Sequence, residues 1–427
     1  MRRLLKLNPL RAKPRGRTIN PHLHRLMSSI RAVLLKPAPE AEPDDTCLPR
    51  SIDQTKRARL GLCHGTEITM SWSDLRADLV TAIAGRFTDL ADLSSFRSVC
   101  PSWRSASAAH AARRRVPLLL VPNGDHRTGF NHGVWSLTDD RLREIPLLSA
   151  CNFPYIFASH NGWMLVVKYN LSVTLVHPSA GGSADLPMVP GWFHGDIEER
   201  LGDMAWDRSS HGVVVSMPYM GVFFCRPGDR SWRPIVGCSC AFVTSVTYCD
   251  GAFFLLAGRK VMVVDAGTMA VAAVIEPPPA VKATPGWLYK ISLVVSPDEF
   301  LLVRTPLHYS VSNGLRVKVF RASRAGTSWS EVDGIGGRAV FVDHVRAFCV
   351  EANVLNGLKG NCVYVAARSY EEVQDEYGTM SVNGRYTVSM HDIADDLTTV
   401  DLSLKKEVTV WSNMFWQWPS WLWPSPG

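Results

Sequence analysis

The sequence predicts a mainly β protein: a disordered basic tail, then a small three-helix module, then a β-propeller of about six or seven blades. Short apolar runs begin near residue 117 and continue to about residue 410. They recur roughly every 8–12 residues, which is typical of sandwiches, barrels and propellers. About 300 residues of such runs are too many for a simple sandwich. At roughly 40–50 residues per four-stranded blade they make six or seven blades.

Turn dipeptides separate these runs. Asn161-Gly162, Asp250-Gly251 and Asn313-Gly314 fit tight hairpins. Residues 370–378 are acid-rich and are expected to form a solvated loop. The large indole side chains of the β segment are expected to pack between blades, and these are Trp135, Trp163, Trp206, Trp232 and Trp329.

Residues 71–112 predict three short helices. Apolar residues four apart place one set on a single helical face, namely Leu75, Leu79 and Ile83. Thr88 or Asp89 can cap a second helix that carries Leu90, Leu93, Phe96 and Val99. Pro101 lacks the N–H that a helix interior needs, but a first helical position tolerates it. Pro101 therefore starts a third helix, SWRSASAAHAARRR, which contains Trp103.

Four segments follow from these patterns. Residues 1–70 are a disordered basic tail and linker, and residues 71–112 are the helical module. Residues 116–412 form the propeller, and residues 413–427 are a Trp/Pro-rich C-terminal tail. The arginine-rich, acid-free start also resembles an organellar presequence, although a disordered tail is the simpler interpretation.

The net charge of +7 belongs to the N-terminal tail. Residues 1–36 hold ten Lys and Arg and no Asp or Glu. Without them the chain has 36 basic and 39 acidic residues, a net charge of −3. Bulk charge therefore predicts no nucleic-acid partner for the folded part. No apolar run reaches the roughly 18 residues of a membrane-spanning helix, so no membrane partner is expected.

Enzyme motifs are missing from the sequence. It contains no GxSxG, HExxH or GxxxxGK[ST] pattern, and its ten cysteines form no CxxC pair. We therefore expect no catalytic residue, no metal and no cofactor. A glycosidase site built from carboxylates on different blades stays open as an alternative, and adjacent carboxylates occur at Asp139-Asp140, Glu198-Glu199 and Asp395-Asp396.

The helical module resembles an F-box. Leu75, Asp78 and Leu79 match the start of the family pattern. Its more specific ending, Phe-Arg-x-Val-Cys-x-x-Trp-Arg, is matched by Phe96, Arg97, Val99, Cys100, Trp103 and Arg104. The family's proline after the first leucine is replaced by Arg76, which puts the strength of docking in question.

The β segment resembles the KIB-type β-propeller of plant F-box proteins. The matching stretches keep their order across the domain. They are VHPSAGGSADLP (176–187), FFCRPGDRSW (223–232), YCDGAFFLLAGRKVMVVD (248–265), KVFRASRAGTSWSEVDGIGGRAVFVD (318–343), GLKGNCVYVA (357–366) and WPSWLWPSPG (418–427).

Together the two resemblances imply a non-catalytic substrate receptor of an SCF-type cullin–RING ubiquitin ligase. The F-box would dock on a Skp adaptor, and the propeller would bind an unidentified protein substrate. The implied adaptor-binding residues are Leu75, Asp78, Leu79, Ile83, Phe96, Val99, Cys100, Trp103 and Arg104. The expected location is the nucleus and cytoplasm. The alternative is a non-ligase propeller binding protein with a decayed F-box, either cytosolic or directed to a mitochondrion or plastid by the basic N-terminus.

Overall fold

The structure is a computed structural model. It describes residues 75–422 except 87–89, 114–115, 123–131, 138–140, 145–154, 161, 168–171, 178–181, 189–202, 208–211, 218–219, 239–242, 284, 287, 308–315, 325–327, 355, 375–379, 396–398, 402–407 and 411–419. The chain divides into two compact units, Met1–Arg114 and Arg115–Gly427. No helix among the described residues is long and apolar enough to cross a membrane.

The first unit is helical. Its described elements are α2 (Ala77–Ala84), α3 (Leu90–Arg97), α4 (Pro101–Ala106) and α5 (Ala108–Arg113). The sequence predicts one helix after Pro101, whereas the structure has two, separated by Ser107. The Ser107 hydroxyl donates to the Trp103 carbonyl at 2.6 Å, and such back-bonding by serine bends or ends a helix. The predicted caps Thr88 and Asp89 lie outside the described residues.

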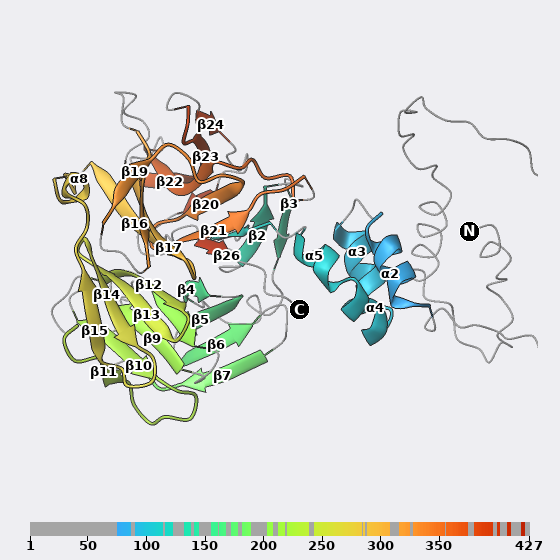
Figure 1. The fold of residues 1–427 in the computed structure, drawn as a ribbon, viewed down its shortest axis with the longest axis horizontal. Coiled ribbons are helices and arrows are strands. Elements are labelled where there is room, and N and C mark those ends of the chain that lie inside the picture. Colours follow the sequence, from blue (N-terminus) through green and yellow to red (C-terminus); the bar gives the residue numbers. More distant parts are fainter. Residues whose placement is uncertain are drawn as a thin grey trace, which may run out of the picture. The chain divides into compact units, whose positions relative to one another are not determined.

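The second unit is a β-propeller of six sheets, arranged around a common centre in Figure 1. The mainly β fold class is confirmed, and the predicted six or seven blades become six. The strands are β1 (Leu118–Pro122), β2 (His132–Ser136), β3 (Arg141–Glu144), β4 (Tyr155–His160), β5 (Trp163–Val167), β6 (Val173–His177), β7 (Gly182–Leu186), β8 (Met204–Asp207), β9 (Gly212–Met217), β10 (Gly221–Cys225), β11 (Arg233–Pro234), β12 (Val243–Cys249), β13 (Ala252–Ala257), β14 (Lys260–Asp265), β15 (Val271–Ile275), β16 (Tyr289–Val295), β17 (Glu299–Pro306), β18 (Lys318–Ser323), β19 (Ser330–Val332), β20 (Arg338–Val342), β21 (Ala347–Glu351), β22 (Cys362–Gln374), β23 (Met380–Asp392), β24 (Thr399–Asp401), β25 (Val408–Val410) and β26 (Ser420–Leu422). A short helix, α8 (Pro279–Lys282), connects β15 to β16.

Four blades are regular meanders of four antiparallel strands: β4–β7, β8–β11, β12–β15 and β16–β19. Their first strands are innermost, since β4 contacts β8, β8 contacts β12, and β12 contacts β16. The hairpin between β12 and β13 uses Asp250 (φ 46°) and Gly251 (φ 80°), as the Asp-Gly pair predicts.

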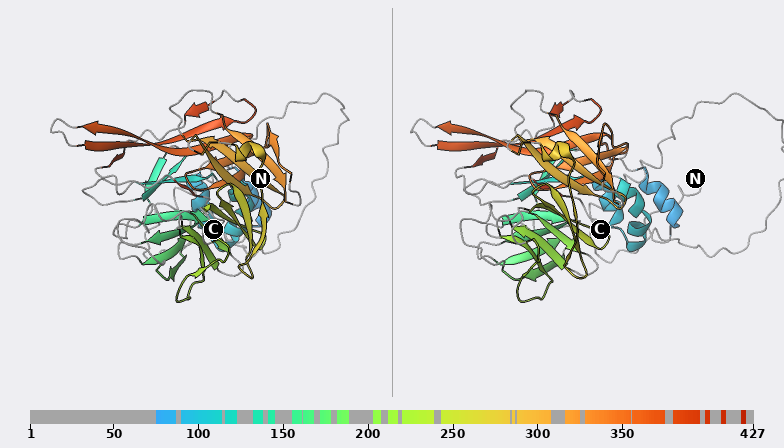
Figure 2. Two further views of the ribbon diagram at one scale, coloured as in Figure 1. Left: turned by 90° about the vertical axis from the view of Figure 1, so that its left-hand side faces the viewer. Right: turned by 60° about the vertical axis from the view of Figure 1, so that its left-hand side comes forward.

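The last blade is irregular. Its strand order is β21-β20-β22-β23-β24, and β22 runs parallel to β20. β22 and β23 form a hairpin of 13 paired positions that extends away from the other strands in Figure 2. The acid-rich loop predicted at 370–378 is therefore wrong over 370–374, because those residues belong to β22.

The C-terminal strand closes the ring. β26 pairs antiparallel with β1 and contacts β4, so the last and first parts of the propeller share one sheet. The sequence places 413–427 in a tail, but Ser420–Leu422 lie inside the fold. Trp421 is 1% exposed, and burial of its large apolar indole stabilises the pairing of this segment with the sheet.

Apolar clusters fill the spaces between neighbouring blades. One cluster joins residues of the β4–β7 and β8–β11 sheets, and Trp163 stacks on Trp206 across it with ring centroids 5.4 Å apart. Trp232 belongs to the same cluster, and its indole N–H donates to the Pro187 carbonyl at 2.7 Å. The prediction that these tryptophans pack between blades is confirmed.

Candidate functional site

The helices of the first unit enclose an apolar core of their own. Phe96 and Trp103 are fully buried, and their ring centroids lie 4.4 Å apart. The remaining buried members are Val80, Ile83, Ala84, Leu93 and Ala111, with Leu75, Cys100 and Ala106 packed against them. A unit this small can bury only a limited apolar area, and these residues form the apolar core of its described helices.

The junction between α3 and α4 delivers both aromatic rings to this core. α3 ends at Arg97, one residue after Phe96. Cys100 is the extended N-cap residue of α4, and its Sγ accepts the Trp103 N–H at 3.5 Å. Pro101 occupies the first turn, where no intrahelical N–H bond is lost. The prediction that Pro101 separates two helices is confirmed.

Other residues of the motif face outward. Leu79 on α2 keeps 38% of its surface exposed, and Val99 between α3 and α4 keeps 37%. Asp78 and Arg104 are also exposed. The Arg104 Nε donates to the carbonyl of Arg97 at 3.4 Å, which holds its side chain along the end of α3. The unit therefore presents both apolar and charged groups to solvent.

The nine residues predicted to bind an adaptor fall into three groups. Ile83, Phe96 and Trp103 are buried in the helical core. Leu75 and Cys100 are half-buried at its margin. The remaining four are exposed: Asp78, Leu79, Val99 and Arg104. Only the exposed and marginal groups are available for direct contact in this conformation. The buried three hold the helices in place.

Arg76 has the backbone conformation of the proline it replaces. It is the N-cap residue of α2 with φ −61° and ψ 143°, and proline fixes φ near about −65°. Its guanidinium forms a two-point ion pair with the Asp78 carboxylate at 3.1 and 3.0 Å. The entry of the chain into α2 is therefore preserved without the proline.

We predict that the free energy of unfolding of Arg76→Pro exceeds that of Arg76→Ala by about 0.4–1 kcal/mol. Both variants lose the Arg76–Asp78 ion pair, which is exposed and worth about 1 kcal/mol or less. Only proline also restricts the unfolded chain. Urea denaturation followed by helical circular dichroism measures the difference. A proline variant less stable than the alanine variant would show that the backbone here does not suit proline.

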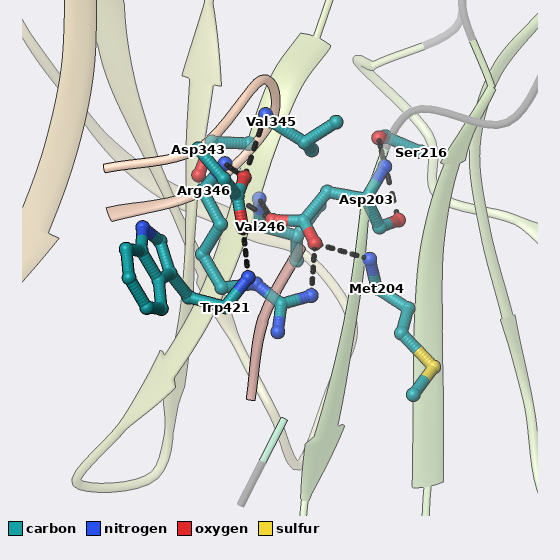
Figure 3. A network of polar contacts seen from close by, with 9 residues as sticks. Asp203, Met204, Ser216, Val246, Asp343, Val345, Arg346 and Trp421 are labelled. Carbon is teal, nitrogen blue, oxygen red and sulfur yellow. Dashed lines mark hydrogen bonds and ion pairs between the residues drawn. The ribbon is translucent and has the colours of Figure 1, made fainter. Parts of the chain in front are cut away.

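A second polar site lies at the centre of the propeller (Figure 3). Asp203 lies just before β8. Its Oδ1 accepts hydrogen bonds from the Arg346 Nη2 group at 2.6 Å and from the Met204 N–H at 2.8 Å. Its Oδ2 accepts the Val246 N–H of β12 at 2.8 Å. The Asp203 N–H donates to the Ser216 hydroxyl at 2.8 Å. One carboxylate thus links three blades.

Asp343 is engaged in the same way. Its Oδ1 accepts the Val345 and Arg346 N–H groups at 2.9 and 2.8 Å, and its Oδ2 accepts the Trp421 N–H of β26 at 2.8 Å. Its carbonyl accepts the Lys290 ammonium of β16. Burial lowers the pKa of Lys290 to about 8, against the pull of the two carboxylates.

The chemistry of this network is structural. Burial raises the pKa of Asp203, and the Arg346 charge opposes that effect. Every oxygen of both carboxylates accepts a hydrogen bond from the protein. These bonds join inner strands of different blades, so the network stabilises the centre of the propeller.

The adjacent carboxylates named from the sequence lie mostly outside the described residues. Asp139-Asp140, Glu198-Glu199 and Asp396 lie outside the described residues. Within the described part of the chain, no cluster of His, Cys, Asp and Glu could hold a metal ion. The Cys225, Cys349 and Cys362 thiols have pKa values that burial raises to about 12, 11 and 11, so they are poor nucleophiles at neutral pH.

Fold and site together define a β-propeller protein that carries a separate helical module. The KIB1-4 β-propeller family model matches residues 134–392, which is more than half of the chain. The chain therefore belongs to the KIB1-4 β-propeller family, as a plant F-box protein with a KIB-type propeller.

Three relatives from Arabidopsis thaliana are similar to it. An F-box/kelch-repeat protein, At5g24040, is 22% identical over 69% of this chain and 86% of its own length. The F-box protein SKIP23 is 22% identical over 83% of this chain and 96% of its own length. The F-box protein At1g65770 is 33% identical, over 25% of this chain and 29% of its own length.

Proposed function

We propose that this chain is a substrate-receptor subunit of an SCF-type cullin–RING ubiquitin ligase. The helices between residues 77 and 113 dock on a Skp-type adaptor, and the propeller binds the target protein. One observation carries the proposal: the module buries Phe96 and Trp103 in its own core yet exposes Leu79 and Val99. Both lie within the F-box-like motif, and apolar side chains left exposed there, in a chain similar to F-box proteins, favour a protein partner.

The receptor contributes proximity rather than chemistry. The ligase arm carries activated ubiquitin, and the propeller holds a substrate lysine near it. Holding two reactants together can raise the effective concentration by many orders of magnitude. This mechanism needs no catalytic residue in the receptor.

Adaptor binding should depend on the two exposed apolar side chains. We predict that Leu79→Ala combined with Val99→Ala weakens adaptor affinity by roughly tenfold or more, because each CH₂ group buried on binding is worth about 0.8 kcal/mol and the two truncations remove several such groups. The fold should survive, since both side chains are already more than one third exposed. Calorimetric titration of a Skp adaptor into each purified variant gives the affinity.

Val236→Ala is the matched control, because it truncates an 83% exposed valine on the propeller. It should bind the adaptor like the unmodified chain. If the double variant keeps its helical circular dichroism and binds the adaptor as tightly as the unmodified chain, the proposal that Leu79 and Val99 contact the adaptor is wrong. Trp103→Ala cannot replace this test, because it removes a core side chain and would abolish binding by unfolding the module.

A nuclear and cytoplasmic location belongs to the same proposal. The competing function, an organellar or cytosolic propeller with a decayed F-box, is based on Arg76 and on the basic N-terminus. The proline-like backbone of Arg76 speaks against the first of these arguments. A fluorescent fusion tests the second, since organellar signal that is lost on deleting residues 1–40 would favour the competing function.

A further inference from the structure

The outer edge of the β12–β15 sheet differs from the outer edges of the other five sheets. The outer edge of each other sheet carries a charged residue: β3 has Arg141, Arg143 and Glu144, β7 has Asp185, β11 has Arg233, β19 has Glu331, and the edge formed by β24 and the uncharged β25 has Asp401 on β24. β15 reads VAAVI, and the chain has no charged residue from Ala266 to Ile275. Charges on edge strands are a usual protection against pairing with another chain.

This edge is open to solvent. β15 pairs with β14 on one side, and no described strand pairs with its other side. Ala272, Ala273 and Val274 are exposed, and Val274 keeps 51% of its surface. The turn that carries Val236 (83% exposed) lies beside the start of β15, since a Cβ on Gly237 would be 3.4 Å from Val271. An apolar edge and an apolar turn thus adjoin.

The charges at the two ends of β15 are opposite. Asp265 lies at its start, where its N–H bonds to the Ala270 carbonyl and its carboxylate accepts the Thr268 N–H at 2.8 Å. At the other end, Lys260 and Lys282 share Glu276 at 2.7 and 2.9 Å, leaving an excess of positive charge. An antiparallel second copy of the same strand would place each acidic end beside a basic end.

We propose that β15 pairs antiparallel with β15 of a second copy of this chain across a two-fold axis. The two β12–β15 sheets then form one continuous sheet. Because the centre of β15 carries no charge, the pairing brings no like charges together there. The acidic end of each strand attracts the basic end of the other. β15 belongs to the propeller unit and not to the helical module, so the proposal does not depend on adaptor binding.

Light scattering of the purified full chain over a wide concentration range tests the pairing. The mass should rise from 47.3 kDa toward twice that value as concentration increases. Val274→Lys should weaken self-association severalfold, because pairing about Ala273, the middle of β15, places the two lysines on one face as diagonal neighbours about 7–8 Å apart, where like charges repel. Val354→Lys is the matched control: it charges a 98% exposed valine on another blade and should dimerise normally.

A mixing experiment separates strand pairing from a general effect of charge. Val274→Lys and Val274→Glu, labelled with different fluorophores, should each self-associate weakly alone and associate more strongly with each other when mixed. A chain that stays monomeric at every concentration overturns the proposal. The same result is expected if the edge binds a peptide from another protein instead. A Val274→Lys dimer as strong as the unmodified one also overturns the proposal, as does a Val354→Lys chain that dissociates equally.

Discussion

Trp421→Ala is expected to destabilise the propeller by about 3–5 kcal/mol, the usual cost of truncating a buried tryptophan. Trp421 is 1% exposed on β26, and its ring meets Phe341 edge-on with centroids 4.9 Å apart. Its indole N–H donates to the Val342 carbonyl at 3.0 Å. The substitution removes apolar contact and a hydrogen bond at the strand that closes the ring.

Two further variants separate the loss of apolar contact at Trp421 from the loss of its hydrogen bond, and ring closure from tryptophan truncation in general. Trp421→Phe keeps most of the apolar area but leaves the Val342 carbonyl without the indole donor, so it should cost about 1–3 kcal/mol. Trp329→Ala is the matched control, because Trp329 is half-buried and its indole N–H bonds the Glu276 carbonyl at an exposed position. Chemical denaturation followed by fluorescence and far-ultraviolet circular dichroism ranks the variants. Equal losses for Trp421→Ala and Trp329→Ala would contradict a special role for ring closure.

Local signals predicted the helical unit well. Pro101 and the Asp-Gly turn act through their own backbone preferences, so their effects can be inferred from neighbouring residues alone. The sequence could not separate buried from exposed positions, because Phe96 and Val99 share one helical spacing. Only the packing of α3 on α4 turns Phe96 inward and leaves Val99 partly in solvent.

Long-range contacts were beyond the sequence. Asp203 and Arg346 lie 143 positions apart, and nothing near either residue indicates the other. The one local signal is that Asp203 and Asp343 each adjoin a buried apolar strand, where a lone carboxylate needs a partner. Ring closure by β26 failed as a prediction for the same reason. Its pairing partner β1 begins about 300 residues earlier in the chain.

The central network provides the second large effect. Asp203→Asn should destabilise the propeller by about 3–5 kcal/mol, because it leaves the buried Arg346 guanidinium facing a neutral amide. The side chains are 0% and 9% exposed, so water cannot replace the lost carboxylate. The amide also has a single acceptor oxygen, whereas both Asp203 oxygens now accept hydrogen bonds. One of those donors therefore faces an NH₂ group.

Asp229→Asn is the matched control. It removes the same charge from an ion pair with Arg233 at 3.3 Å, but there the side chains are 32% and 59% exposed, so the cost should be about 1 kcal/mol or less. Replacing Asp203 with Leu and Arg346 with Met together should recover part of the loss, since no charge is then buried alone. Recovery should stop short of the unmodified chain, because the Val246 N–H still loses its acceptor. If Asp203→Asn cost no more than Asp229→Asn in chemical denaturation, the network would not be what holds the inner strands together.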